Sequence, residues 1–261
     1  MTRVLVGLVC LGMTCGVLAQ QVTAQDAATS VKLRWFGMSM FQLETTAGKK
    51  IVFDPHAIPE FGRNLVQADV ILCSHLHSDH TQTSIVENAK SARLFYGVEQ
   101  AKKGRSPEWK AVNEKVGQIS VRAVGLYHDN DDGLVRGKVS AFIVECDGLK
   151  FCHLGDLGHE LTPAQVKAIG PVDVLMVPCG GIYTVNGDGA KRAVAKLKPR
   201  LYVLPMHYGL PGYDELLPLD EFLDGPTAVK KLPSTNELVI PLDLKADNPT
   251  IVVLGWTPAK K

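Results

Sequence analysis

The sequence lacks an excess of charge of either sign. Its 261 residues include 28 Lys and Arg against 27 Asp and Glu, which gives a formal net charge of +1. A protein without a net electrostatic field does not concentrate polyanions such as nucleic acid, or anionic lipid, at its surface. We therefore expect a small-molecule substrate and no nucleic-acid partner.

Long apolar runs are also absent beyond residue 19. A membrane-spanning helix needs about 20 consecutive apolar residues. Residues 1–19 form a shorter apolar run that carries one positive charge, at Arg3, and ends in Val17-Leu18-Ala19, a layout typical of a secretory signal peptide. We expect export to the periplasm or to the medium, with cleavage near Ala19 and no membrane attachment afterwards; an uncleaved anchor is the alternative.

The expected organisation beyond the signal peptide is simple. Residues 20–30 are polar and rich in Ala, Thr and Gln, which predicts a linker. Residues 31–261 are long enough for one large domain with a sizeable core. The sequence gives no indication of the oligomeric state.

Cysteines are too few and too dispersed for a disulfide-stapled fold. The four beyond residue 19 all lie in apolar, strand-like stretches: Cys73, Cys146, Cys152 and Cys179. A two-residue hairpin loop at Asp147-Gly148 pairs Cys146 with Leu149 and leaves Cys152 out of register for a disulfide. We expect four buried free thiols and no cysteine nucleophile.

Short apolar segments separated by Gly and Pro predict many β-strands. They are residues 31–36, 40–45, 50–54, 69–73, 92–96, 118–127, 139–145, 149–153, 172–177, 200–204, 237–240 and 250–255. Helices are predicted over 163–169, with Thr162 as the N-cap, and over 189–197, with shorter ones at 84–88 and 226–231. Strands interspersed with helices favour an α/β sandwich over a barrel or a bundle.

The most informative motif directly follows the predicted strand 69–73. It is Ser74-His75-Leu76-His77-Ser78-Asp79-His80, with three imidazoles and a carboxylate among six residues. These groups bind zinc, iron or manganese. His75 and His77 are two residues apart and can chelate one ion from extended backbone, while Asp79 and His80 can face a second ion. A His-rich surface tract is the alternative, but the position after a buried strand argues against it.

Further candidate ligands stand where other predicted strands end. His128 ends the run 118–127, Asp156 follows 151–155, and His207 follows 201–206. Functional groups are often found at such positions, because a rigid sheet holds the loop that carries them.

Together these motifs resemble the metallo-beta-lactamase superfamily. The runs Tyr127-His128-Asp129, His153-Leu154-Gly155-Asp156-Leu157-Gly158-His159 and Pro205-Met206-His207-Tyr208 are similar to its branch of ascorbate-phosphate lactonase-like hydrolases. The resemblance covers nearly all of residues 31–256. It implies an αββα sandwich with the site at one edge, between the two sheets.

The resemblance also implies two divalent metal ions and a role for each ligand. His75, His77 and His128 would hold one ion, Asp79, His80 and His207 the other, and Asp156 would bridge both. Asp54 would brace the histidine loop from behind. Zn²⁺ is the default for such donors, with Mn²⁺ and Fe²⁺ as alternatives. The ions would lower the pKa of a shared water and present hydroxide to the substrate, with Asp79 also orienting it.

Several side chains near these ligands have open roles. His159 is expected to contact substrate or to make a structural hydrogen bond. Tyr183 and Tyr208 are candidate substrate-orienting hydroxyls, with packing as the alternative. His153 is expected to pack beside the site, and His56 to face solvent.

The predicted function is hydrolysis of an ester, lactone or phosphoester of a small substrate. The lack of a basic field favours a carbonyl ester or lactone. A true beta-lactamase, a phosphodiesterase or nuclease of the same fold, and a non-catalytic metal-binding protein are the alternatives. Nucleic-acid-processing relatives usually add an inserted domain or a basic arm, and neither is visible in this sequence.

Overall fold

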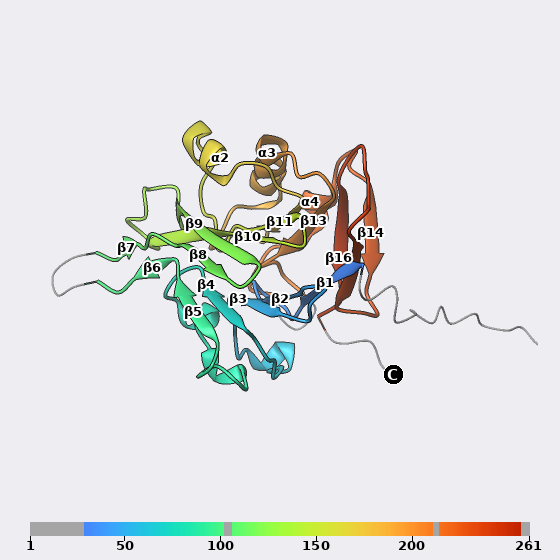
Figure 1. The fold of residues 1–261 in the computed structure, drawn as a ribbon. Coiled ribbons are helices and arrows are strands. Elements are labelled where there is room, and N and C mark those ends of the chain that lie inside the picture. Colours follow the sequence, from blue (N-terminus) through green and yellow to red (C-terminus); the bar gives the residue numbers. More distant parts are fainter. Residues whose placement is uncertain (1–28, 102–105, 211–213, 257–261) are drawn as a thin grey trace, which may run out of the picture.

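A computed structural model of the protein describes residues 29–101, 106–210 and 214–256. The predicted signal peptide and residues 20–28 of the predicted linker lie outside the described residues. Two β-sheets lie face to face, and helices α2 and α3 cover the outer face of the larger sheet (Figure 1). This arrangement confirms the predicted αββα sandwich.

The smaller sheet has six strands in the order β15-β1-β2-β3-β4-β5. Their bounds are β1 (Ser30–Trp35), β2 (Phe41–Glu44), β3 (Lys50–Phe53), β4 (Val70–Cys73), β5 (Arg93–Tyr96) and β15 (Glu237–Pro241). All four residues of β4 are buried. A strand covered on both faces is apolar throughout, which explains its sequence Val-Ile-Leu-Cys.

The larger sheet has eight strands in the order β14-β16-β13-β12-β11-β10-β9-β8. Their bounds are β8 (Asn113–Val116), β9 (Ile119–Tyr127), β10 (Lys138–Cys146), β11 (Leu149–His153), β12 (Val174–Pro178), β13 (Tyr202–Met206), β14 (Val229–Leu232) and β16 (Thr250–Leu254). A separate pair is formed by β6 (Val98–Glu99) and β7 (Glu108–Trp109).

The helices are short. They are α2 (Pro163–Ile169), α3 (Gly187–Leu197) and α4 (Asp220–Leu223), with 3₁₀ turns η1 (Pro59–Phe61), η2 (Ser78–His80) and η3 (Thr83–Ile85). Helix α2 has the predicted bounds and begins with a reciprocal capping box between Thr162 and Gln165, a contact that stabilises a helix by about 1 kcal/mol. Among the described residues, no helix is long and apolar enough to cross a membrane.

The main core lies between the two sheets. Phe41 and Phe53 of the smaller sheet and Phe142 and Phe151 of the larger one belong to a single buried cluster. Each such side chain contributes roughly 1.5–3 kcal/mol by leaving water. The two sheets are therefore held in a fixed relation, and so are the loops at their ends.

Three details of the sequence prediction differ from the structure. Residues 226–231, predicted as a helix, contain strand β14, which pairs in parallel with β16. The predicted helix 84–88 is instead the 3₁₀ turn η3. Ser30, assigned to the linker, begins β1 and pairs with Pro241. In the first and third cases, pairing with a distant strand outweighs the local pattern.

The prediction for the cysteines is confirmed. All four in the described residues are buried and free. Strand β10 pairs with β11 so that Cys146 lies opposite Leu149, with Asp147 and Gly148 in the turn at positive φ. Burial raises the pKa of the Cys179 thiol far above its usual value, which leaves no reactive thiolate.

Candidate metal centre

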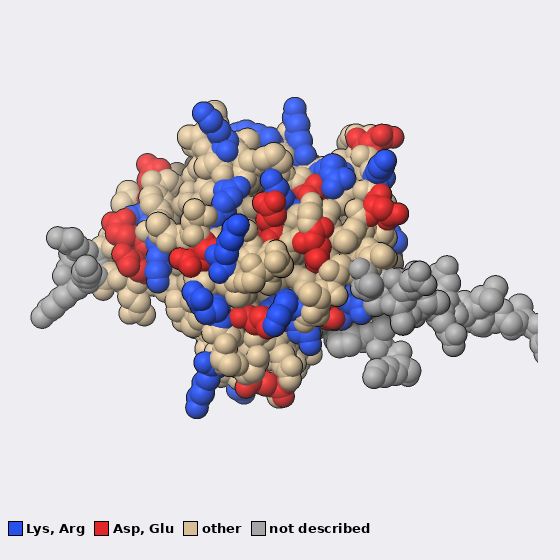
Figure 2. All heavy atoms as spheres, in the orientation of Figure 1, with Lys and Arg blue, Asp and Glu red and all other residues tan. Residues whose placement is uncertain are grey.

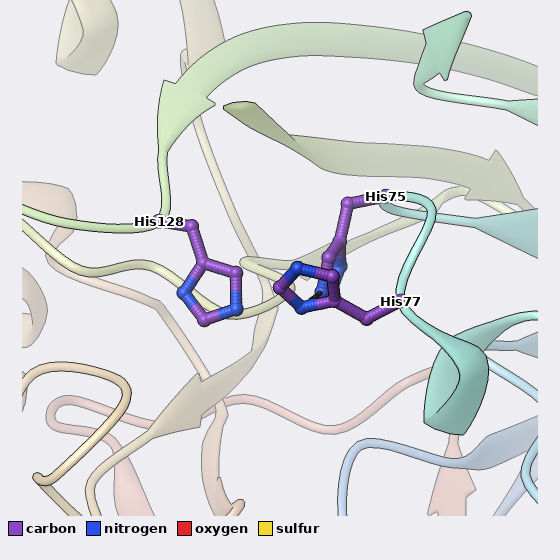
Figure 3. Close-up of side chains that lie close together, drawn as sticks. All are labelled: His75, His77 and His128. Atoms are coloured by element: carbon purple, nitrogen blue, oxygen red, sulfur yellow. Dashed lines mark hydrogen bonds between the residues drawn. The ribbon is translucent and has the colours of Figure 1, made fainter. Parts of the chain in front are cut away.

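The structure brings all seven predicted ligands together where the two sheets end. They follow four strands: His75, His77, Asp79 and His80 come after β4, His128 after β9, Asp156 after β11 and His207 after β13. Figure 3 shows His75 and His77 on the loop after β4 turned toward His128 at the end of β9. Side chains from both sheets therefore meet at one point.

The first cluster consists of His75, His77 and His128. One ring nitrogen from each lies within 4.8 Å of the others. The His75 Nε2 and His77 Nδ1 atoms are 3.0 Å apart. Three imidazole nitrogens converging at this distance form the donor set of a typical zinc site with an open fourth position.

The second cluster consists of Asp79, His80 and His207, whose ligand atoms also lie within 4.8 Å of one another. His80 Nε2 is 3.2 Å from Asp79 Oδ2. This set combines two imidazoles with a carboxylate, which suits zinc, iron or manganese.

Asp156 lies between the two clusters. Its Oδ2 atom is 3.2 Å from Nε2 of both His80 and His207, and 3.3 Å from Nε2 of His128. Its distance to His75 Nε2 is 3.9 Å. One carboxylate oxygen thus faces nitrogens of both clusters, which is the geometry of a bridging ligand.

Asp54 sets the orientation of two of the histidines from behind. His80 Nδ1 donates to Asp54 Oδ2 at 2.9 Å, and Ser74 Oγ donates to the same oxygen at 2.6 Å. His75 Nδ1 in turn donates to Ser74 Oγ at 2.9 Å. In this network both histidines carry a proton on Nδ1 and present the Nε2 lone pair toward Asp156. This arrangement matches the bracing role predicted for Asp54.

The electrostatics of the site favour a neutral His75 and ionised Asp79 and Asp156. Burial holds the pKa of His75 well below its usual value. Burial acts to raise the pKa of Asp156, but His207 and His80 outweigh it and keep that pKa well below the usual range. Burial likewise opposes ionisation of Asp79, yet the His80 ring, whose Nε2 lies 3.2 Å from Asp79 Oδ2, lowers its pKa to about 2. These are the protonation states in which such groups bind metals.

The surroundings of His80 Nε2 indicate whether a cation fits between the ligands. Its Nε2 atom is buried and has no hydrogen-bond partner, although Asp79 and Asp156 each place an oxygen 3.2 Å away. Burial lowers the pKa of His80, but Asp156 and Asp54 outweigh it and raise that pKa well above its usual value. The space between these atoms therefore attracts positive charge, and the donor set fits divalent metal ions.

The backbone at the ligands is unusual in two ways. Asp54 and His207 directly follow β3 and β13 with φ of 44° and 51°, a conformation that costs roughly 1–3 kcal/mol and is concentrated at functional sites. A Cβ on Gly158 would lie 2.2 Å from the carbonyl carbon of His128, and one on Gly180 would lie 2.2 Å from the His207 carbonyl oxygen. Only glycine lets the neighbouring loops pack on these ligands.

Ser39 also belongs to the site, although no sequence motif indicates it. Its hydroxyl donates to Asp156 Oδ1 at 3.1 Å, and its carbonyl oxygen lies 2.8 Å from His153 Nε2. The neighbouring Met38 carbonyl accepts a hydrogen bond from the backbone N–H of His207 at 3.1 Å. The turn between β1 and β2 thus positions groups on the opposite sheet. A serine between two strands has no motif that would reveal this role.

Two histidines outside the clusters have structural positions. His153 is buried and its ring stacks on Phe53 at 5.2 Å, so the prediction of a packed histidine is confirmed. The expectation that His56 faces solvent is wrong. Its Nε2 lies 3.1 Å from the Phe36 carbonyl, its Nδ1 accepts from the Ile58 N–H, and burial lowers its pKa to about 4. It is a neutral bridge between two loops.

The remaining substrate candidates lie in different environments. Tyr208 is buried and stacks on Trp35 at 5.3 Å. It therefore packs in the core, which was the alternative to a substrate-orienting role. Tyr183 is 44% exposed, with the Arg136 guanidinium 5.3 Å above its ring. His159 is partly buried and its Nδ1 donates to the Glu160 carbonyl at 2.9 Å.

A two-sheet α/β sandwich with a histidine and aspartate cluster at its strand ends defines a class of metal-binding αββα proteins. The model of the Beta-lactamase superfamily domain matches residues 32–207, and the chain belongs to this family. It is similar to UPF0173 metal-dependent hydrolases. One from Pyrococcus abyssi is 31% identical over 203 residues, covering 68% of this chain and 84% of the relative.

Solved structures agree with this assignment. A Thermotoga maritima protein assigned to the Zn-dependent hydrolases of the metallo-beta-lactamase superfamily superposes with a TM-score of 0.65 at 34% identity, over 86% of this chain and 98% of that one. A Parabacteroides distasonis protein described as a metal-dependent hydrolase shares the fold, with a TM-score of 0.52 at 20% identity over 74% and 89%. The protein is a metal-dependent hydrolase of the metallo-beta-lactamase superfamily.

Proposed function

We propose that the protein is a binuclear hydrolase that cleaves an ester, lactone or phosphoester of a small substrate, with preference for a carbonyl ester or lactone. The observation that carries this proposal is the position of Asp156 Oδ2, at 3.2–3.3 Å from histidine nitrogens of both ligand clusters. A buried carboxylate oxygen shared in this way is explained by two cations, one on each side.

Each cluster would hold one ion, and Asp156 would contact both. Bound there, the ions supply Lewis-acid activation of water and polarisation of the scissile bond. Zinc is the default for a nitrogen-rich donor set, with manganese and iron as alternatives.

Asp79 is the group best placed to orient the attacking water. Its side chain is 36% exposed, whereas that of Asp156 is 3% exposed. It therefore meets solvent, whereas His80 and His207 of the same cluster are buried. Its pKa of about 2 keeps it ionised, so it can orient the water by accepting a hydrogen bond. The candidate catalytic pair is thus Asp79 and Asp156.

The charge distribution supports a small substrate. Figure 2 shows Lys and Arg interspersed with Asp and Glu over the face that it displays, without a field of one sign. A nuclease would be expected to gather basic side chains into a track for the phosphate backbone. This pattern favours the small carbonyl substrate over the phosphodiesterase alternative.

Metal analysis with matched variants tests the proposal. Purified protein is analysed by inductively coupled plasma mass spectrometry beside His77→Ala and, as a control, His56→Ala, which removes a buried histidine with no atom in either cluster. We expect about two ions per chain in the wild type and the control, and fewer in His77→Ala. Hydrolysis of lactones, carboxylic esters and phosphodiesters is then compared. No bound metal in the wild type would overturn the proposal.

A further inference from the structure

Exposed apolar side chains are concentrated on three loops at the metal centre. Five of the large hydrophobic residues that are exposed in the described part of the chain follow strands β9, β12 and β13: Leu134, Val135, Ile182, Tyr183 and Leu217. We call these five residues the apolar rim. Leu134 is 86% exposed and Val135 is 65% exposed. Apolar side chains gathered in this way on a monomer mark a binding surface.

The first of these loops is rigidly built. The carboxylate of Asp129, next to His128, accepts four backbone hydrogen bonds at 2.6–3.0 Å, from the N–H groups of Asp131, Gly133, Val135 and Arg136. These hydrogen bonds order the loop and keep the side chains of Leu134 and Val135 in contact with solvent. Their exposure is a fixed property of the fold.

Contacts join the three loops into one surface. The Arg136 guanidinium lies 5.3 Å from the ring centre of Tyr183, which ties the first loop to the second. The Leu217 N–H donates to the Gly180 carbonyl at 2.8 Å, which ties the third loop to the second. The loops that carry the five residues of the apolar rim are therefore connected to one another.

Ile182 has a conformation that the local sequence does not favour. Its φ is 55°, in the left-handed region that β-branched residues avoid, and its side chain is 54% exposed. Neither backbone preference nor core packing explains an isoleucine there. Strained residues of this kind are concentrated at ligand-binding sites.

A hollow of about 410 Å³ lies between the loops, within the size range of small-molecule sites. Residues from all three loops line it, together with the loop after Asp156. The apolar Ile182, Val185 and Leu217 lie there beside Gly158 and the polar Asn130, His159, Glu160 and Arg192. Gly158 packs directly on the backbone of His128, so the hollow adjoins the metal centre.

His159 supplies a polar group in this hollow. Its Nδ1 donates to the Glu160 carbonyl, so its Nε2 carries the lone pair, and that atom is buried with no hydrogen-bond partner. The hollow therefore combines the apolar side chains of Ile182, Val185 and Leu217 with polar groups, one of which is an unsatisfied acceptor, and this combination is usual for a ligand site.

We propose, on the basis of the hydrolase function proposed above, that the apolar rim and the hollow bind an apolar group of the substrate, an acyl chain of medium length attached to the scissile carbonyl. The surface is concave and its loops are those that carry His128 and His207, which favours a substrate over a macromolecular partner. Each methylene buried there raises kcat/KM by up to about fourfold.

The test is a series of p-nitrophenyl esters, from acetate through butyrate to octanoate, with the metal-loaded protein. The double variant Leu134→Ser/Ile182→Asn removes two rim side chains, and asparagine tolerates the left-handed backbone at position 182. Leu65→Ser is the matched control, because Leu65 is 64% exposed but lies on a loop that does not follow β9, β12 or β13. The measured quantity is the ratio of kcat/KM for octanoate to that for acetate.

We expect a ratio above about 10 in the wild type and in Leu65→Ser, and a fall of at least fivefold in the double variant. Hydrolysis of all esters with a flat chain-length profile, or a ratio that the double variant leaves unchanged, would overturn this proposal while the hydrolase function stands. Absence of both metal and hydrolysis would instead overturn the hydrolase function.

Binding of octanoate, measured by calorimetry, gives a readout that does not depend on turnover. We expect binding that weakens at least tenfold in the double variant and is unchanged in Leu65→Ser. No octanoate binding to the wild type would overturn the proposal. A different result would also overturn it: the wild type sediments with phosphatidylcholine vesicles or dimerises on gel filtration, the double variant loses that behaviour, and the ester ratio stays flat. The apolar rim would then bind a membrane or a second copy of the chain.

Discussion

Ser39 and Asp156 are 117 residues apart in the sequence, and the hydroxyl of the first donates to Oδ1 of the second at 3.1 Å. Because Oδ1 is occupied in this way, Oδ2 is the oxygen turned toward the histidine nitrogens, 3.2 Å from His207 Nε2. Ser39 belongs to the turn after β1 and Asp156 to the loop after β11, so each sheet supplies one partner. The contact links the packing of the two sheets to the orientation of the central carboxylate.

Removing this hydroxyl should weaken metal binding without unfolding the protein. We expect Ser39→Ala to lower metal affinity about 10- to 100-fold, the usual effect of losing a hydrogen bond to a ligand. Competition with a chromophoric chelator measures the affinity. Thr46→Ala is a matched control, because the Thr46 hydroxyl also donates to a distant carboxylate, that of Asp147 at 2.6 Å, away from the site. Equal affinities in both variants would show that Ser39 does not position Asp156.

Asp156 should be indispensable for both ions. We expect Asp156→Ala to abolish hydrolysis and to lower the metal content, because one bridging carboxylate serves both clusters. The loss of activity should exceed the roughly 100-fold loss that is the upper end for mutating a residue that only hydrogen-bonds to a metal ligand. Metal analysis and an ester assay measure the two effects, and Asp69→Asn, which removes a surface charge paired with Lys49, serves as the control. Wild-type turnover in Asp156→Ala would contradict the assignment.

Asp54 offers a test of charge alone. Its φ of 44° is tolerated by asparagine, so Asp54→Asn keeps the backbone and removes only the negative charge and one acceptor. The substitution weakens the hydrogen bonds from His80 Nδ1 and Ser74 Oγ. We expect metal affinity to fall about 10- to 100-fold while circular dichroism stays native. A variant that binds metal as tightly as the wild type would remove Asp54 from the support of the site.

The sequence was sufficient to predict that these seven side chains lie together because their signals are local. His75, His77, Asp79 and His80 stand within six residues after a wholly apolar strand, and His128, Asp156 and His207 each follow the end of another strand. Apolar periodicity predicts where strands end, and strand ends of packed sheets lie together. The chemistry of the donors then points to a metal without further information.

Other parts of the site depend on which segments meet in space, which no local pattern reveals. Ser39 donates a hydrogen bond to Asp156 across the interface between the sheets. His56 is buried against a segment about 20 residues earlier in the chain, where its Nε2 contacts the carbonyl oxygens of Phe36 and Gly37. Tyr208 follows a ligand directly, yet its ring turns into the core against Trp35. Strand β14 resembled a helix because its edge position leaves Val229, Lys230 and Lys231 exposed, without the alternation of a half-buried strand.

Removing the metal should lower the thermal stability of the protein by a large amount. A ligand that binds only the folded state stabilises it by about 4.1 kcal/mol when present at 1,000 times its dissociation constant. For a chain of this size, each kcal/mol corresponds to roughly 2–4 °C in Tm, so chelation should lower the Tm by about 10 °C. Scanning calorimetry with and without a chelator measures it. His77→Ala, which lacks a ligand from the start, should show a smaller shift, and an equal Tm in the wild type with and without chelator would mean that these side chains do not hold metal in the folded protein.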